Sequence, residues 1–326
     1  MRNKTFLLSA LPLLGCLLGL RTSVSAQANA SNQQPDVASL IQKLANADEV
    51  ERGPIMEQLD QIKDPDVLVP PVLAALDTVD PQDAWKLFDI LARFSDAVKP
   101  EPLIRFARRS DTVPPTLEPQ LIAMGDRARQ PLLKAIDDAC VTWKPLPPVS
   151  NSQTGGEDSD SENQAQHSRK FLHWASSALA DLGSAGLSDL MQMLRGHSAC
   201  QQSAGQFGLT QYMLGAAPTL DPGVVHGLSD ALSVADPTVQ KAAVAVVEPM
   251  IGYERATLSP AMTTSLFAIL KTHPDAEARS TAFGLLQRAR GDAPRRAAEI
   301  ASHDLDESIQ NSAINFLENL PRPHLL

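Results

Sequence analysis

The side chains that could bind a metal or carry out catalysis are few and widely separated. His197 precedes Cys200 by three residues and His167 precedes His173 by six, but neither pair has a second pair that would complete a tetrahedral site. The chain has no Gly-x-Ser-x-Gly, no phosphate-binding Gly loop, no His-Glu-x-x-His and no Cys-x-x-Cys. The many carboxylates of an acidic chain single out no catalytic pair. The sequence therefore predicts no catalytic, cofactor-binding or metal-binding residue, and no enzyme.

Two groups of arginines are candidates for binding a partner. Arg105, Arg108 and Arg109 lie three to four residues apart, which places them in one basic stripe if the segment is helical. A second group spans a turn further along the chain: Arg288, Arg290, Arg295 and Arg296. Such groups usually form a solvated face or pair with nearby acids. Their functional interpretation is a landing patch for an acidic segment of another protein.

The overall charge limits the kinds of partner. The chain carries 28 Lys and Arg against 38 Asp and Glu, a formal net charge of -10. This balance argues against nucleic acid and against an anionic membrane surface as main partners. Apolar residues make up 43% of the chain and aromatic residues only 4%, so we expect a core of Leu, Ala, Ile and Val. Trp85, Trp174 and Phe88 are expected to fill that core rather than form a ligand platform.

The first 26 residues have the pattern of an export signal. Arg2 and Lys4 precede an apolar run over residues 6–20, and small residues follow up to Ala26. We expect cleavage after Ala26 and an exported protein, periplasmic or secreted. After this signal, no stretch of the sequence is long and apolar enough to predict a membrane span.

An alternative interpretation of the same region is a lipid anchor. Leu13-Leu14-Gly15-Cys16 resembles a bacterial lipobox, in which the cysteine is lipidated and becomes the new N-terminus. The apolar run continues past Cys16 to Leu20, whereas a lipobox cysteine normally closes that run. Cys16 is thus an alternative lipidation site, which would make the protein a membrane-anchored lipoprotein.

Helical periodicity extends through the rest of the chain. Apolar residues recur at one-face spacing, as at positions 37, 40, 41 and 44, and no stretch alternates apolar with polar residues. Three helix starts share one pattern: Asp, two residues, a small or branched apolar residue, three residues, and Ala. Asp accepts from the free backbone N–H groups of a helix start, and the apolar residue and Ala share one face. The three copies are Asp236/Val239/Ala243, Asp275/Ala278/Ala282 and Asp306/Ile309/Ala313.

A second repeat marks helix ends. Residues 121–136 match residues 179–194 position for position, with Gly125 and Gly183 at equivalent places. Glycine there is typical of a left-handed cap that ends one helix before a short turn and a new apolar helix. The pattern predicts a helix–turn–helix unit that occurs twice.

These repeats resemble HEAT repeats of the armadillo-type fold, in particular the short bacterial HEAT-like units. The resemblance implies an all-α fold, an α-solenoid of antiparallel helix pairs, with about six or seven irregular repeats at roughly 40 residues each. It covers most of residues 37–320. The spacing between the Asp starts is irregular, and residues 98–119 and 200–226 fit poorly. The residues that carry the resemblance are Asp236, Pro237, Val239, Ala243, Asp275, Ala278, Ala282, Asp306, Ile309, Ala313, Gly125 and Gly183.

An acidic insertion divides the solenoid. Residues 145–169 are rich in Pro, Gly and acids and nearly free of apolar side chains, so we expect a disordered loop between two helices of one unit. HEAT-like repeats are expected over residues 37–144 and again over 170–320, continuing the same solenoid. Residues 27–36 form a disordered N-terminal segment, and residues 321–326 a tail.

Cys140 and Cys200 are the thiols that remain after signal removal. In the two matched units Cys140 lies four residues after Ile136 and Cys200 six after Leu194, so both are expected just past the ends of equivalent helices. Export would deliver them to an oxidising compartment. Two outcomes are open: a disulfide between neighbouring units, or two separate buried thiols.

A solenoid exposes a long surface, and its usual use is to hold another protein or peptide. The sequence therefore favours an exported, non-enzymatic protein-interaction scaffold with a protein or peptide partner and no cofactor. The alternative is a structural envelope lipoprotein anchored through Cys16. A less favoured alternative is enzymatic, because some bacterial HEAT-like repeats resemble those of phycobilisome lyases, which attach bilin chromophores. That activity belongs inside the cell, so the export signal argues against it.

Overall fold

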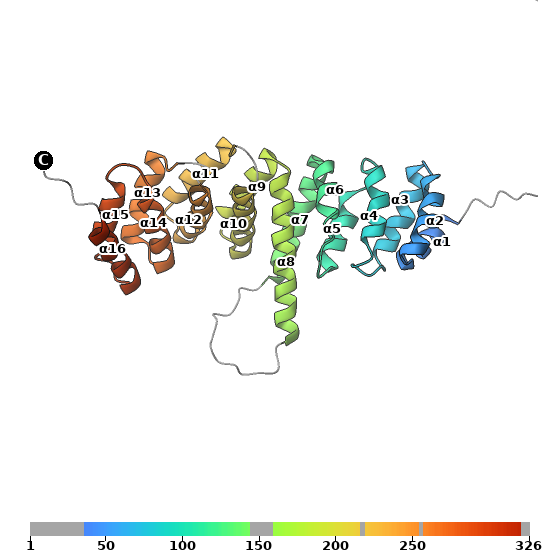
Figure 1. Cartoon of the computed structure of the whole chain (residues 1–326), viewed down its shortest axis with the longest axis horizontal. Helices are drawn as coiled ribbons and strands as arrows, with labels where there is room; N and C mark the ends of the chain where they lie inside the picture. The colour runs from blue at the N-terminus through green and yellow to red at the C-terminus, as the bar shows by residue number, and fades with distance from the viewer. Residues whose placement is uncertain (1–35, 144–158, 216–218, 254–256, 321–326) are drawn as a thin grey trace, which may run out of the picture. The chain divides into compact units, whose positions relative to one another are not determined.

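The computed structural model describes residues 36–143, 159–215, 219–253 and 257–320. The predicted signal with Cys16, residues 27–35 and the tail at 321–326 lie outside the described residues. The described residues form sixteen α-helices and one short 3-10 helix, with no strand among them (Figure 1). No described helix has the length and apolar character that crossing a membrane requires.

The helices follow one another in chain order within the unit Val37–Leu326, as the colours of Figure 1 show. Their bounds are α1 Val37–Asn46, α2 Glu49–Asp60, α3 Pro65–Leu76, α4 Trp85–Leu91 with the 3-10 turn Ala92–Phe94, α5 Pro100–Arg109, α6 Leu117–Met124, α7 Asp126–Thr142, α8 Ser159–Asp181, α9 Ser184–Leu194, α10 Ala199–Leu214, α11 Pro222–Ser233, α12 Pro237–Gly252, α13 Pro260–Thr272, α14 Ala276–Gln287, α15 Ala293–Ala301 and α16 Glu307–Asn319.

Consecutive helices pack as pairs, and the pairs stack in two layers. From α9 onward, the odd-numbered helices α9, α11, α13 and α15 contact one another in sequence, and so do the even-numbered α10, α12, α14 and α16. At the N-terminal end the order is less regular, because α1 contacts both α3 and α4. This arrangement confirms the predicted α-solenoid. Sixteen helices make eight pairs rather than six or seven, because several pairs are shorter than 40 residues.

Aspartates begin many of the helices, as predicted. Asp236 accepts from the N–H of Thr238, Asp275 from Ala278, and Asp306 from Ser308 and Ile309. Asp64 caps α3 in the same way. The apolar residue and the alanine of each repeat are buried: Val239, Ala243, Ala278, Ala282, Ile309 and Ala313. The repeated pattern therefore combines a cap with a contact face that lets the next helix approach closely.

Gly125 and Gly183 lie in very short connections between helices. Gly125 alone separates α6 from α7, and Leu182 and Gly183 separate α8 from α9. Their φ angles are positive as predicted, 54° and 80°, but their ψ angles of -131° and -156° lie outside the left-handed helical region. Glycine alone reaches that part of backbone space readily. The connection is thus tighter than the expected left-handed cap.

The structure corrects the predicted extent of the insertion. Residues 144–158 lie outside the described residues, but α8 already begins at Ser159, so residues 159–169 are helical rather than disordered. Gln164, Ala165 and Gln166 are compatible with a helix. His167 attaches this part of α8 to α5, with Nδ1 2.9 Å from Asp111 Oδ1 and Nε2 2.5 Å from the carbonyl oxygen of Arg108. Composition alone could not reveal this anchor.

The core is aliphatic, as the composition indicates, and runs through all the pairs. Phe88 is fully buried against Phe106 in an edge-to-face contact. Trp174 is half-buried and lies beside Phe171. Trp85 differs from the expectation, since it is 37% exposed and the Arg52 guanidinium covers its ring at 4.1 Å from the centroid.

Candidate partner-binding surface

The histidines whose spacing resembled that of metal ligands do not converge on one site. His173 stacks on Phe207 with ring centroids 3.8 Å apart, and burial, aided by the Arg169 charge, lowers the pKa of its imidazole. His197 is exposed with Nδ1 3.8 Å from Asp236 Oδ2, and His167 contacts Asp111 and the Arg108 carbonyl. Across the described ranges, no group of three or more His, Cys, Asp or Glu could hold a metal ion.

The structure joins Cys140 and Cys200. Their Cα atoms are 5.5 Å apart, within the range of protein disulfides. Cys140 lies in the last turn of α7 and Cys200 in the first turn of α10, rather than both just past helix ends. Of the two outcomes that the sequence left open, this geometry favours the disulfide. Its formation in the exported protein stays a prediction.

The first arginine stripe contacts mainly its own chain. Arg109 donates to the backbone carbonyls of Leu76 and Asp77, which follow one another at the C-terminal end of α3. Arg108 Nη2 donates to the carbonyl of Asp138 at 3.3 Å. Arg105 lies 3.7 Å from the Asp77 carboxylate, and 65% of its side chain is exposed. Arg109 thus binds carbonyls at the end of α3, Arg108 binds a carbonyl within α7, and Arg105 faces an acid.

Three members of the second arginine group line a hollow near the C-terminal end of the described helices. We call it the arginine groove, of about 990 Å³, and define it by Arg288, Arg290, Arg296, Phe267, Thr263 and Leu258. Arg295 is exposed but is not part of its lining. The end of α12, the start of α13, the end of α14 and the start of α15 enclose it.

Local backbone structure brings these arginines together. Arg288 follows the last residue of α14, and Arg290 lies two residues further on. Gly291 has a φ of 74°, which glycine adopts without strain, and it turns the chain into α15. Thr263 and Phe267 lie four residues apart on α13 and therefore on one face. The turn and this helix face explain how residues from three neighbouring pairs come to line one groove.

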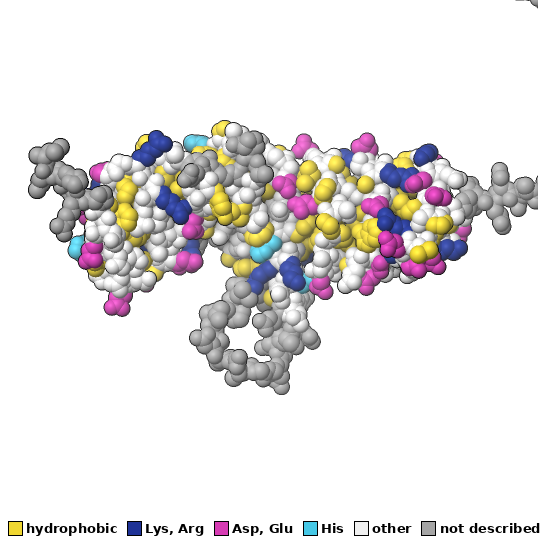
Figure 2. Space-filling model, viewed as in Figure 1, with side chains coloured by type: hydrophobic (Ala, Val, Ile, Leu, Met, Phe, Trp, Pro, Cys, Tyr) yellow, Lys and Arg dark blue, Asp and Glu magenta, His cyan; other side chains and the backbone are white. Residues whose placement is uncertain are grey.

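The arginine groove is positively charged and only weakly compensated. Arg296 lies over the ring of Phe267, with the guanidinium carbon 5.0 Å from the centroid, and its Nη1 is 3.9 Å from Asp292 Oδ2. Within the ranges that the structure covers, no carboxylate forms an ion pair with Arg288 or Arg290. Elsewhere, Figure 2 shows basic and acidic side chains interspersed on the viewed face. The groove is therefore a local exception in an acidic protein.

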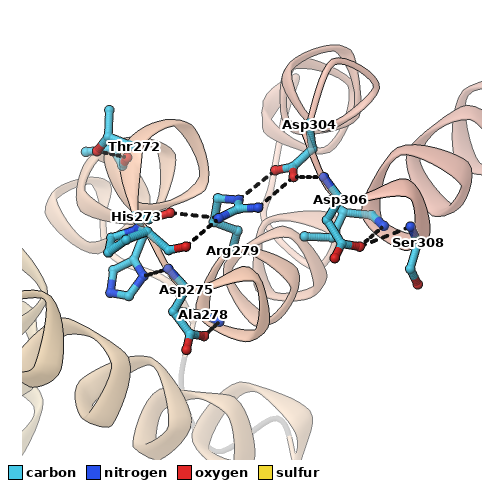
Figure 3. A network of polar contacts seen from close by, with 11 residues as sticks. Thr272, His273, Asp275, Ala278, Arg279, Asp304, Asp306 and Ser308 are labelled. Atoms are coloured by element: carbon cyan, nitrogen blue, oxygen red, sulfur yellow. Dashed lines mark hydrogen bonds and ion pairs between the residues drawn. The ribbon is translucent and has the colours of Figure 1, made fainter.

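A polar network joins the last repeats and was not predicted (Figure 3). Lys241 of α12 donates to Asp275 Oδ2 at 2.8 Å, and Arg279 of α14 donates to both carboxylate oxygens of Asp304 at 2.8 and 2.9 Å. Hydrogen bonding to Lys241 lowers the pKa of Asp275, and hydrogen bonding to Arg279 lowers that of Asp304. The available signal was a basic residue four or five positions after two of the cap aspartates, Lys241 after Asp236 and Arg279 after Asp275, but its acceptor lies in the next repeat.

Comparison with known proteins adds little beyond the fold. No family model matches the chain, and no curated protein matches it. Similar solved structures include a triple mutant of Kap121p, at 16% identity and a TM-score of 0.45, and Kap121p itself, at 14% and 0.42. Each match covers 86% of this chain but only 32% of the other, so this chain spans about a third of their length. Both TM-scores are below 0.5, and the fold assignment rests on the helices described above.

Proposed function

We propose that the protein is an exported scaffold that holds a segment of a protein partner in the grooves between its helix pairs. The observation that carries this proposal is the two-layer stack, because neighbouring pairs leave open grooves between them. One lies among α10, α12 and α14, another between α9 and α11, and the arginine groove near α13 and α15. Extended surfaces of this kind suit polypeptides, whereas a small substrate usually needs one enclosed pocket.

The role that we propose is binding rather than catalysis. In support of this role, several polar side chains of the described residues act as helix caps or as links between repeats. Asp236, Asp275 and Asp306 bind backbone N–H groups, and Arg279 links two repeats. Export is proposed from the sequence of residues 1–26 alone. Labelling with a fatty-acid probe, with Cys16→Ala as the control, separates a cleaved signal from a lipid anchor.

Recovery of a partner tests the scaffold. The full chain carrying a C-terminal tag is produced in cells, cross-linked, and isolated from the envelope fraction, and the bound proteins are quantified by mass spectrometry. We expect at least one protein in a fixed ratio to the chain, displaced by an excess of untagged chain. The same isolation is repeated from the periplasmic and medium fractions. If untagged chain displaces none of the recovered proteins in any of the three fractions, the proposal is contradicted.

A further inference from the structure

We propose that the arginine groove is the docking site for a carboxylate-rich segment of the protein partner, in which acidic side chains flank an apolar one. The inference rests on the proposed function, because it names the chemistry of that partner. The sequence offers two basic groups and favours the first of them, Arg105, Arg108 and Arg109, as the partner-binding patch. The structure separates them by what their guanidiniums already contact.

The first group has little capacity left for a partner. Arg109 already donates to two carbonyl oxygens at the end of α3, and Arg108 donates to a third, that of Asp138. Moving Arg109 to a partner would leave the carbonyls at the end of α3 without that donor, and moving Arg108 would break its hydrogen bond to α7. Arg105 has a carboxylate beside it already. Binding of an acidic segment here would exchange existing contacts rather than add new ones.

The arginine groove has the opposite property. Arg288 and Arg290 are exposed and form no ion pair with any carboxylate of the described ranges, and the pair of Arg296 with Asp292 is long, at 3.9 Å. The three charges converge on one hollow in a chain whose net charge is -10. Mutual repulsion of the three cations would be relieved by incoming carboxylates. Charge complementarity therefore selects an acidic occupant.

Guanidinium geometry favours carboxylates in particular. An Arg fork binds a carboxylate through two parallel N–H···O bonds, which an ammonium group cannot reproduce. The contact of Arg296 with Phe267 restrains one guanidinium before the partner arrives, which lowers the entropy lost on binding.

The apolar part of the lining specifies the centre of the segment. Phe267 and Leu258 lie in the same groove as the three arginines, together with Ile251 and Pro260 from the neighbouring helices. An entirely acidic strand would leave this apolar surface uncovered. A segment with one apolar residue between carboxylates matches both parts of the lining, burying the apolar side chain and pairing the acids.

A recessed groove with acids nearby does not suit nucleic acid or an anionic membrane. Nucleic acid and membrane surfaces present long or flat arrays of negative charge, and these require a broad basic field. Here Asp292 lines the same hollow, and acidic side chains are interspersed over the face seen in Figure 2. A short acidic polypeptide meets three arginines and one aspartate in the groove, so the local charge that it encounters is still positive.

Fluorescence anisotropy with a synthetic peptide tests the inference. The probe is a labelled peptide of about a dozen residues with Asp and Glu flanking a central Leu, and its control has Asn and Gln in place of the acids. We expect the full chain to bind the acidic peptide at least about tenfold more tightly than the control. The variant Arg288→Gln/Arg290→Gln/Arg296→Gln should lose this preference, whereas Arg105→Gln/Arg108→Gln should retain it. Lys at the same three groove positions should give an intermediate affinity.

The contrary outcomes are distinct. Equal binding of the acidic and amide peptides, or unchanged binding by the triple Gln variant with a native circular dichroism spectrum, would overturn the inference. Binding to vesicles of anionic phospholipid without binding to the peptide would also overturn it. If the chain recovers a displaceable partner from cells and the triple Gln variant recovers it equally well, the scaffold stands and this docking site is wrong. If no partner is recovered by any form, the proposed function itself fails.

Discussion

Arg279 donates to both carboxylate oxygens of Asp304, from Nε at 2.8 Å and from Nη2 at 2.9 Å, and thereby links two neighbouring helix pairs. Both side chains are nearly buried, with 12% and 5% of their surfaces exposed. Asp304 Oδ1 also accepts from the backbone N–H of Asp306, which in turn caps α16 (Figure 3). One carboxylate therefore supports both the contact between repeats and the start of the next helix.

Replacing this carboxylate should weaken the C-terminal repeats. We expect Asp304→Asn to lower the free energy of unfolding by about 2–3 kcal/mol at pH 7, because the nearly buried Arg279 loses its charged partner. Urea denaturation followed by circular dichroism measures the change. The control is Asp292→Asn, since the Asp292 carboxylate is exposed and its ion pair is long, at 3.9 Å. A loss of equal size in both variants would contradict a special role for Asp304.

The pKa of Asp304 predicts how the free energy of unfolding depends on pH. Hydrogen bonding to Arg279 lowers the pKa of Asp304 in the folded protein. A lowered pKa means that this stabilisation is complete above the unfolded value of about 3.9 and disappears as the pH falls through the folded value. The difference between the native chain and Asp304→Asn should therefore shrink as the pH falls below about 4. A difference that stays constant down to pH 2 would show that the carboxylate charge is not responsible.

Reduction of the Cys140–Cys200 bond should destabilise the middle of the solenoid. The bond would close a loop with a sequence separation of 60, which contains the acidic insertion. Chain-entropy reasoning gives a stabilisation on the order of 4 kcal/mol as an upper figure. We expect Cys140→Ser/Cys200→Ser to unfold at lower urea concentration than the native chain, and dithiothreitol to affect only the native chain. Two freely alkylated thiols in the unreduced, denatured protein would refute the bond.

Cleavage within residues 144–158 should leave the two halves associated. Arg129 on α7 binds both oxygens of Asp189 on α9 at 2.6 and 2.7 Å, and Gln201 reaches Asp137 at 2.8 Å. The apolar faces of α7, α8 and α10 also pack together. Because the disulfide would join the halves covalently, gel filtration after limited proteolysis is run with reductant. Co-elution is expected, and separation without denaturant would mean that the cut segment is an interdomain linker.

Gly205 lets α10 approach α9 closely. A Cβ at this position would lie 2.6 Å from the backbone oxygen of Leu190 and 2.6 Å from the backbone nitrogen of Leu194. We expect Gly205→Ala to destabilise the protein by about 1–3 kcal/mol, because the backbone of α9 must shift. Gly284→Ala is the matched control, since no atom lies within 4 Å of its Cβ position, and it should stabilise the helix by up to about 1 kcal/mol. Thermal unfolding of both variants checks the sign of each effect.

The sequence predicts local features better than contacts between repeats. The cap aspartates at 236, 275 and 306 and the glycines at 125 and 183 follow from local chemistry, so the repeated pattern was sufficient to find them. The prediction that residues 159–169 are disordered was wrong, because this part of α8 is held by the contact of His167 with Asp111, which is distant in sequence. The hydrogen bonds from Arg109 to the carbonyls at the end of α3 were missed for the same reason. Such contacts depend on how one pair is placed on the next, which periodicity does not specify.

Cross-linking from inside the arginine groove tests the central claim most directly. A photo-activated amino acid replaces Thr263, which lines the groove, or Thr281, a matched half-buried threonine in the groove among α10, α12 and α14. We predict that the probe at position 263 captures a protein in the producing cells. Mass spectrometry should place the cross-link in a segment with carboxylates flanking an apolar residue. The double variant Arg288→Gln/Arg290→Gln should abolish this capture. Capture from position 281 alone, or a cross-link at position 263 to a segment without carboxylates, would contradict the account.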